Sequence, residues 1–113
     1  MSNKRMIICG KSASGKDFLK TRFKNKGFSV DTSYTTRPIR EGEIADITYH
    51  YISDEEFLNK IRNNEFYEYA RHGDYYYGTG KYEWDNNQIF IMETDGIFHI
   101  NQEDRKDCFI IYL

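Results

Sequence analysis

The sequence has little cysteine and little proline: its 113 residues contain two cysteines and one proline. Cys9 and Cys108 each lie inside an apolar run, so we expect both to be buried, reduced thiols in strands. No spacing of cysteine or histidine typical of a metal site is present.

Long apolar runs and an excess of basic residues are also missing. The apolar run near the N-terminus is too short for a signal peptide or a membrane span. The net charge of −2 argues against a basic nucleic-acid-binding protein. We therefore predict a cytoplasmic protein with neither a membrane nor a nucleic-acid partner. No internal repeat or low-complexity segment is visible.

Aromatic residues are abundant, at 17% of the chain, with ten tyrosines and eight phenylalanines. A tyrosine buries its ring and keeps a polar tip, so these residues suit either a wet pocket or an ordinary core and surface. The length fits one compact domain, which hides roughly two-thirds of the surface of the unfolded chain.

The first third of the chain predicts a parallel sheet covered by helices. Residues 5–9 form an apolar run typical of a buried strand, and residues 16–25 have the spacing of an amphipathic helix that ends at Gly27. Residues 28–36 predict a second strand. A strand, a helix and a strand in this order are typical of an α/β fold.

The remaining elements are predicted from alternation, capping residues and turns. Residues 47–52 suggest short antiparallel strands, and Ser53 with Glu56 forms a capping box for a helix with Phe57, Leu58 and Ile61 on its apolar face. The rest of the chain predicts two strands around a turn at His72-Gly73-Asp74, about two helical turns at 81–87, and buried strands at 88–94 and 107–113.

The segment IICGKSASGKDF, residues 7–18, has the pattern of a phosphate-binding loop. Gly10 and Gly15 bracket four residues, and Lys16 follows them. Glycines allow backbone N–H groups to turn inward towards phosphate oxygens, the following helix adds a partial positive charge, and lysine adds a full one. We predict phosphate binding by Gly10, Lys11, Ser12, Ala13, Ser14, Gly15, Lys16 and Asp17.

Asp17 stands where such loops usually have a hydroxyl that binds Mg²⁺. A carboxylate is also a hard oxygen ligand, so Asp17 can hold Mg²⁺ directly or through water. The alternative is that Asp17 is only a first-turn residue that the helix dipole favours.

Arg37 and Arg40 lie three residues apart around the only proline. Two guanidinium groups that converge from one rigid loop suit a phosphate monoester, which accepts bidentate hydrogen bonds. The alternative is a solvated basic turn.

The segments SYTTRPIREGE (33–43), DITYHYIS (46–53), FYEYARHGDYYYGTG (66–80) and IFIMETDG (89–96) resemble, in this order, the guanylate kinase family. The resemblance implies an α/β P-loop kinase core, with a parallel sheet and helices, at 1–34 and 78–113. It also implies a small inserted mixed α+β subdomain at 35–77 that binds the nucleoside monophosphate. The implied activity transfers a phosphoryl group from ATP to GMP with Mg²⁺.

The resemblance also implies roles for individual residues. Glu68 faces the guanine edge and accepts hydrogen bonds from N1–H and the N2 amino group, which adenine does not offer. Lys16, Arg37 and Glu93 are the implied catalytic residues, and Asp17 and Glu93 the implied Mg²⁺ ligands. The implied GMP-binding residues are Ser33, Arg37, Arg40, Tyr49, Glu68, Tyr77, Thr79 and Asp95.

Each of these residues can also have an ordinary structural role, because carboxylates can lie on the surface and tyrosines can pack on a sheet. His50, His72 and His99 match nothing that requires a histidine, and we expect His72 in solvent. Positioning and charge neutralisation carry phosphoryl transfer, so no general base of that kind is expected.

The sequence departs from the family after residue 113, where family members continue into an arginine-rich lid. The segment between Gly78 and Glu93 is also about one helical turn shorter than the family's, which affects the placement of Thr79 against Asp95. We expect the core's first half and the GMP-binding part without a lid. A fragment of a kinase, a short protein that binds nucleotides but catalyses poorly, and a homo-oligomer that exchanges elements all fit this expectation.

Three functions remain open from the sequence. The first is an ATP:GMP phosphotransferase, which the retained Gly10, Gly15 and Lys16 favour. The second is a truncated or inactive guanylate-kinase-like module that binds nucleotides or a protein partner. The third is a kinase with another nucleotide preference, such as a deoxynucleotide.

Overall fold

The structure is a computed structural model, and it describes residues 5–10, 15–92 and 94–113. The side chains of Asp17, Thr94 and Asp95 lie outside this description. In chain order the elements are β1 (Arg5–Cys9), α1 (Lys16–Asn25), β2 (Tyr34–Thr35), β3 (His50–Tyr51), α2 (Asp54–Arg62), β4 (Phe66–His72), β5 (Tyr75–Gly80), α3 (Lys81–Asn86), β6 (Ile89–Met92), the 3₁₀ helix η1 (Thr94–His99), α4 (Gln102–Lys106) and β7 (Cys108–Tyr112).

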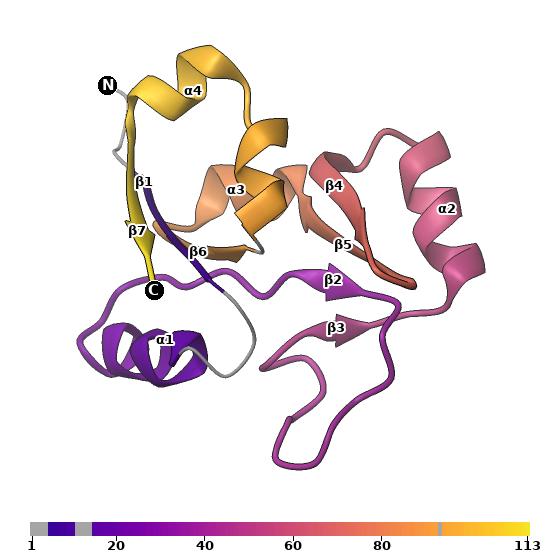
Figure 1. The fold of residues 1–113 in the computed structure, drawn as a ribbon, viewed down its shortest axis with the longest axis horizontal. Coiled ribbons are helices and arrows are strands. Elements are labelled where there is room, and N and C mark those ends of the chain that lie inside the picture. The colour runs from indigo at the N-terminus through magenta and orange to yellow at the C-terminus, as the bar shows by residue number, and fades with distance from the viewer. Residues whose placement is uncertain (1–4, 11–14, 93) are drawn as a thin grey trace.

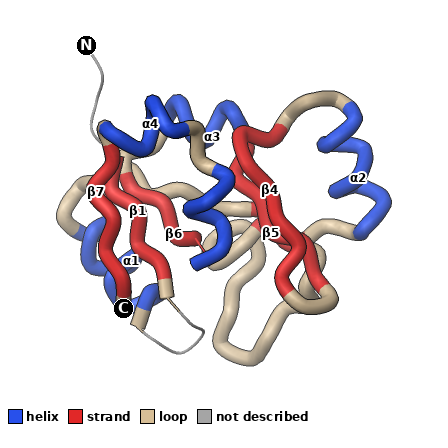
Figure 2. The backbone as a smooth tube through the Cα atoms, turned by 45° about the horizontal axis from the view of Figure 1, so that its top comes forward, coloured by secondary structure: helices blue, strands red, loops and turns tan. Residues whose placement is uncertain are grey.

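The first sheet is parallel, as the sequence predicts, and has the strand order β6-β1-β7. Neighbouring residues of β1 point to opposite faces, which gives the sheet two apolar layers. Ile8 packs with Val30 and Ile89 on the face that Leu19 and Phe23 of α1 cover. On the other face, a second cluster includes Ile7, Cys9, Trp84, Phe90, Met92, Ile97 and Ile100. Helices therefore cover both faces of this sheet (Figures 1 and 2).

The second sheet has the order β3-β2-β5-β4 and lies beside the first (Figure 1). The hairpin of β4 and β5 is antiparallel and turns at Gly73, where a positive φ of 64° favours glycine. Helix α2 begins with the predicted capping box of Ser53 and Glu56. Its Phe57 is fully buried and stacks on Phe66 and Tyr76, which fixes the helix on this sheet.

Residues 28–36 connect the two sheets and form much less strand than predicted. Val30 makes a single parallel bridge with Ile89 of β6, and the Asp31 amide donates to the Ile89 carbonyl at 2.8 Å. The chain then leaves the first sheet and forms the two-residue strand β2 in the second. The predicted strand is short because the segment divides its hydrogen bonds between two sheets.

Three further expectations are corrected by the structure. β3 pairs with β2 in parallel, not in the expected antiparallel arrangement, because the long 36–49 connection returns the chain in the same direction. Leu58 is exposed although it falls on the predicted apolar face of α2. Cys9 is buried but Cys108 is only partly buried on the edge strand β7, and both thiols are free.

Among the described residues, no helix combines the length and the apolar character that crossing a membrane requires.

Candidate active site

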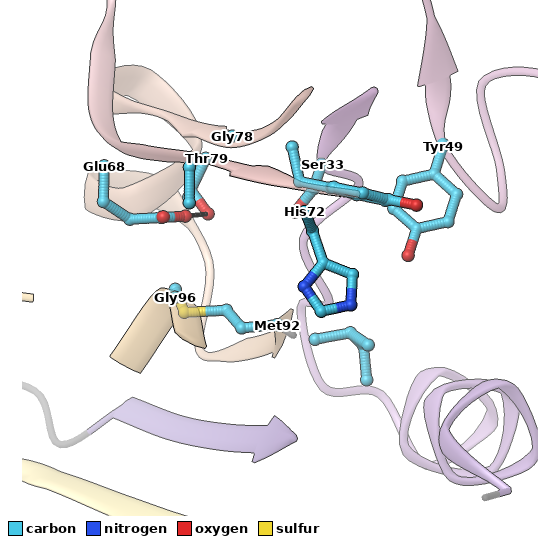
Figure 3. A pocket seen from close by; sticks show the side chains of 11 residues that line it. Ser33, Tyr49, Glu68, His72, Gly78, Thr79, Met92 and Gly96 are labelled. Atoms are coloured by element: carbon cyan, nitrogen blue, oxygen red, sulfur yellow. Dashed lines mark hydrogen bonds between the residues drawn. The ribbon is translucent and has the colours of Figure 1, made fainter. Parts of the chain in front are cut away.

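A narrow pocket lies where the two sheets meet, and its empty space of about 400 Å³ includes open solvent (Figure 3). It receives side chains from the connecting segment, the β4–β5 hairpin and the end of β6. Its lining consists of Ser33, Tyr49, Glu68, Ala70, His72, Tyr77, Gly78, Thr79, Ile91, Met92 and Gly96. Five of the predicted GMP-binding residues, Ser33, Tyr49, Glu68, Tyr77 and Thr79, are thus brought to one cavity.

Glu68 is a buried carboxylate in this cavity, with only 7% of its surface exposed. It pairs with Thr79 across the hairpin, and the Thr79 hydroxyl donates to Glu68 Oε1 at 2.6 Å. Burial raises the pKa of Glu68 to about 7, because desolvation penalises the charged form more than the Thr79 hydrogen bond favours it. A ligand that donates hydrogen bonds to this buried carboxylate therefore stabilises its ionised form.

The raised pKa of Glu68 predicts that the free energy of unfolding falls as the pH rises from about 4.5 to about 7. In this range the unfolded chain has lost a proton that folded Glu68 still holds, so rising pH favours unfolding. The shift corresponds to at most about 3 kcal/mol. Urea denaturation at pH 5 and pH 8 measures it.

Glu68→Gln is the matched variant, since glutamine keeps the shape and cannot ionise. The variant should remove most of the fall in the free energy of unfolding between pH 5 and pH 8. The part that remains is due to Asp31, whose pKa is raised to about 6 by burial. A wild-type protein that is equally stable at pH 5 and pH 8 would contradict the buried carboxylate.

Asp31 is a site residue that the sequence analysis missed. It is 1% exposed, and its Oδ2 accepts a hydrogen bond of 2.7 Å from the Ser33 hydroxyl. Its Oδ1 is buried and meets no hydrogen-bond donor among the residues described. Alternation along residues 30–33 places Asp31 and Ser33 on one side of the chain, but an aspartate in a connecting segment gives no sign that it will be buried.

Arg37 lies close to the cavity with only 6% of its surface exposed, which excludes a solvated turn for this residue. Its Nη1 and Nη2 donate to the two carboxylate oxygens of Glu43 at 2.8 and 2.9 Å. This bidentate pair holds the pKa of Glu43 at about 2 and that of Arg37 well above its usual range. Arg40 of the same segment is exposed, and its backbone N–H also donates to Glu43, at 2.8 Å.

Two tyrosines stand next to Arg37 at one side of the cavity. The rings of Tyr49 and Tyr77 are 6.0 Å apart, and the Arg37 guanidinium lies 5.4 Å from the Tyr49 ring. His72, expected in solvent, is exposed but also lines the cavity, with its ring 6.2 Å from that of Tyr77 (Figure 3). Its position at the end of β4 turns the imidazole towards this side.

The ends of the predicted phosphate loop lie between β1 and α1. Gly15 precedes the helix with a φ of 95°, and Lys16 is the first helical residue. Lys16 is buried, and its Nζ donates to the Gly10 carbonyl at 2.6 Å. Lys11, Ser12, Ala13, Ser14 and Glu93 lie outside the described residues, as do the side chains of Asp17 and Asp95. Within the described part, no group of three or more metal-binding side chains occurs.

The fold and this pocket define an α/β protein in which a buried carboxylate, Glu68, lines a pocket with the buried guanidinium of Arg37 nearby. A family model described as guanylate kinase matches residues 2–104, which is most of the chain. The chain therefore belongs to the guanylate kinase family.

Curated relatives named guanylate kinase are similar over most of this chain. The protein of Clostridium tetani is 36% identical over a match 115 residues long. The match covers 96% of this chain and 55% of that protein. The protein of Helicobacter hepaticus is 45% identical over 100 residues, which cover 83% of this chain and 48% of that protein. The chain thus spans about half the length of the curated relatives it matches.

A solved structure of guanylate kinase from Anaplasma phagocytophilum has the same fold. It superposes with a TM-score of 0.78 at 22% sequence identity, and the match covers 97% of this chain and 59% of that one. At this identity the likeness supports the fold alone.

Proposed function

We propose that this chain carries the GMP-binding part and the phosphate loop of a guanylate kinase. The reaction transfers the γ-phosphoryl group of ATP to GMP or dGMP and gives ADP and GDP. The observation that carries the proposal is the buried Glu68 in a cavity beside the buried Arg37. A carboxylate that lacks strong donors suits the N1–H and N2 amino group of guanine, while a guanidinium suits a phosphate.

In this proposal GMP lies with its base at Glu68 and its phosphate at the tyrosine side. Glu43 holds the Arg37 guanidinium at the cavity, and the two phenols donate to phosphate oxygens without adding charge. Arg40, exposed in the free protein, turns to the phosphate when GMP binds. The proposed GMP-binding residues are Ser33, Arg37, Arg40, Tyr49, Glu68, Tyr77, Thr79 and Asp95.

ATP is the proposed co-substrate, with its phosphates held by residues 10–17. Lys16 and Arg37 neutralise and position the phosphates from the two sides, so phosphoryl transfer needs no general base. Asp17 and Glu93 are the proposed Mg²⁺ ligands, and Glu93 completes the proposed catalytic set. A Mg²⁺ ion held by Asp17 and Glu93 would offset the negative charge of the phosphates.

The proposed partners are therefore small nucleotides. A cytoplasmic location, a homo-oligomer and the division into a core at 1–34 and 78–113 with a GMP-binding part at 35–77 remain predictions from the sequence.

The direct test is ADP formation by the 113-residue chain with Mg-ATP and GMP, dGMP or AMP. We expect turnover with GMP or dGMP and none with AMP above a Lys16→Ala blank. Calorimetry with GMP alone separates binding from chemistry. GMP binding without turnover would mean that this chain supplies recognition and that segments of the longer relatives supply catalysis. Failure to bind GMP at all would contradict the proposal.

A further inference from the structure

We propose that Lys20 is a positioning residue for Tyr49, because it ties helix α1 to the turn that carries Tyr49 into the cavity. The inference rests on the proposed function, in which Tyr49 donates to the phosphate of GMP. Lys20 belongs to none of the predicted site residues, since it lies on a helix one turn after the phosphate loop.

Lys20 is an unusual lysine because only 7% of its surface is exposed. Lysine is rarely buried unless its ammonium group finds hydrogen-bond acceptors. Here Nζ donates to the carbonyl oxygens of Ile47 at 2.6 Å and Thr48 at 3.2 Å. The helix that begins at Lys16 is thereby joined directly to the residues that precede Tyr49.

The turn at residues 44–49 is tied together by its own hydrogen bonds, so an anchor at Ile47 and Thr48 also fixes Tyr49. The Thr48 amide donates to the Ile44 carbonyl at 2.8 Å, and the Ile44 amide donates to the Thr48 hydroxyl at 3.0 Å. The Asp46 amide donates to the Tyr49 carbonyl at 2.8 Å. Movement of the anchored carbonyls therefore moves Tyr49 with them.

The other side of Tyr49 is held by the second sheet. The amide of His50 donates to the Ser33 carbonyl at 2.8 Å, which joins the chain just after Tyr49 to the connecting segment. With Lys20 on one side and β2 on the other, Tyr49 is kept beside Tyr77 and Arg37.

A second, very small pocket next to Lys20 shows which charged groups surround its ammonium group. It is lined by Lys20, Asp31, Ser33, Thr48, Tyr49 and Ile91, and adjoins the GMP cavity through Ser33, Tyr49 and Ile91. Burial and the nearby Glu83 raise the pKa of Asp31, while Lys20 lowers it more strongly than His50, the other cationic partner. The ammonium group therefore supports both the turn and the buried carboxylate.

The test compares GMP with guanosine, which lacks the phosphate that Tyr49 binds. Lys20→Met keeps the length of the side chain and removes its charge and donors. We expect this variant to weaken GMP binding about tenfold, the effect of losing charged hydrogen bonds that hold a ligand group, and to change guanosine binding less than about twofold. Isothermal titration calorimetry on the 113-residue chain measures both ligands.

Lys24→Met is the matched control, because Lys24 is exposed on the same helix one turn further along. It should bind both ligands as the wild-type chain does. If Lys20→Met does not fold, Lys20→Gln, which keeps two N–H donors, serves in the same comparison and should show a smaller but equally selective loss.

A double variant shows whether Lys20 acts through Tyr49. Tyr49→Phe removes only the phenol hydroxyl, so the pair Lys20→Met and Tyr49→Phe should lose little more GMP affinity than Tyr49→Phe alone. Fully additive losses, equal losses for GMP and guanosine, or no loss in either Lys20 variant would overturn the inference while leaving the proposed function intact. A wild-type chain that does not bind GMP would overturn both.

Discussion

Replacing Glu68 with glutamine is expected to weaken GMP binding by roughly 10²- to 10⁴-fold and to leave ATP binding nearly unchanged. Glutamine keeps one carbonyl acceptor, but its amide group presents donors where guanine also presents donors. The clash is costly because Glu68 is buried and solvent cannot replace the lost hydrogen bonds.

The variant should nevertheless fold. The glutamine carbonyl can still accept from the Thr79 hydroxyl, and the raised pKa of Glu68 means that ionisation of this carboxyl opposes folding. We therefore expect Glu68→Gln to be at least as stable as the wild type at pH 8. Unfolding measurements separate a lost ligand contact from a lost fold.

Calorimetric titration with GMP and with Mg-ATP measures the difference between the two ligands. Glu55→Gln is the matched control, because Glu55 is exposed in the first turn of α2 and the same atoms are exchanged. Equal losses for GMP and ATP in Glu68→Gln would overturn the assignment of Glu68 to guanine.

The pH dependence of guanosine binding is a second, independent test of the role of the Glu68 carboxyl group. A carboxylate must be ionised to accept from both N1–H and the N2 amino group, so affinity should rise with pH through about 7 in the wild type. Guanosine is the better probe here because it carries no phosphate that titrates. The rise should be absent in Glu68→Gln.

Removing the side chain of Lys16 is expected to produce the second large effect, on the ATP side. Lys16→Ala should lower ATP-dependent phosphoryl transfer by about 10²-fold or more, the typical loss when one preorganised donor to developing charge is removed. Lys16 begins α1, and its Nζ reaches back to the Gly10 carbonyl across the turn. A bound phosphate would meet this ammonium group together with the N-terminus of the helix.

Titration with ATP and with GMP distinguishes this role from a structural one. Lys16→Ala should weaken ATP binding and leave GMP binding within about twofold, since the GMP cavity does not include Lys16. Lys26→Ala, an exposed lysine just after α1, is the control for the loss of one positive charge. Unchanged ATP affinity in Lys16→Ala would contradict the phosphate loop.

Local patterns in the sequence predicted most helices and strands, because each of these patterns lies within one short segment of the chain. The spacing of apolar residues gives helix 16–25 with its bounds, and Ser53 with Glu56 gives the start of α2. The glycine at the turn of the β4–β5 hairpin requires a positive φ, which marks the turn without any knowledge of the rest of the fold.

Predictions failed where a segment has two competing partners. Residues 28–36 have the composition of one strand, but the structure divides them between β6 and the second sheet. The direction in which β3 pairs with β2 depends on the path of the 36–49 connection, which alternation does not encode. Leu58 falls on the apolar side of α2 by spacing, yet Phe57 alone faces the sheet fully buried.

The sequence by itself determined the family, the order of most elements, though not the helices η1 and α4, and the residue types suited to a phosphate and a guanine base. Only the tertiary structure decided that Glu68 and Asp31 share a buried environment, that Glu43 holds Arg37, and that Lys20 anchors the turn before Tyr49. The type of each residue fixes which hydrogen bonds its side chain can donate or accept. Its burial and its pKa depend on neighbours that come from distant parts of the chain.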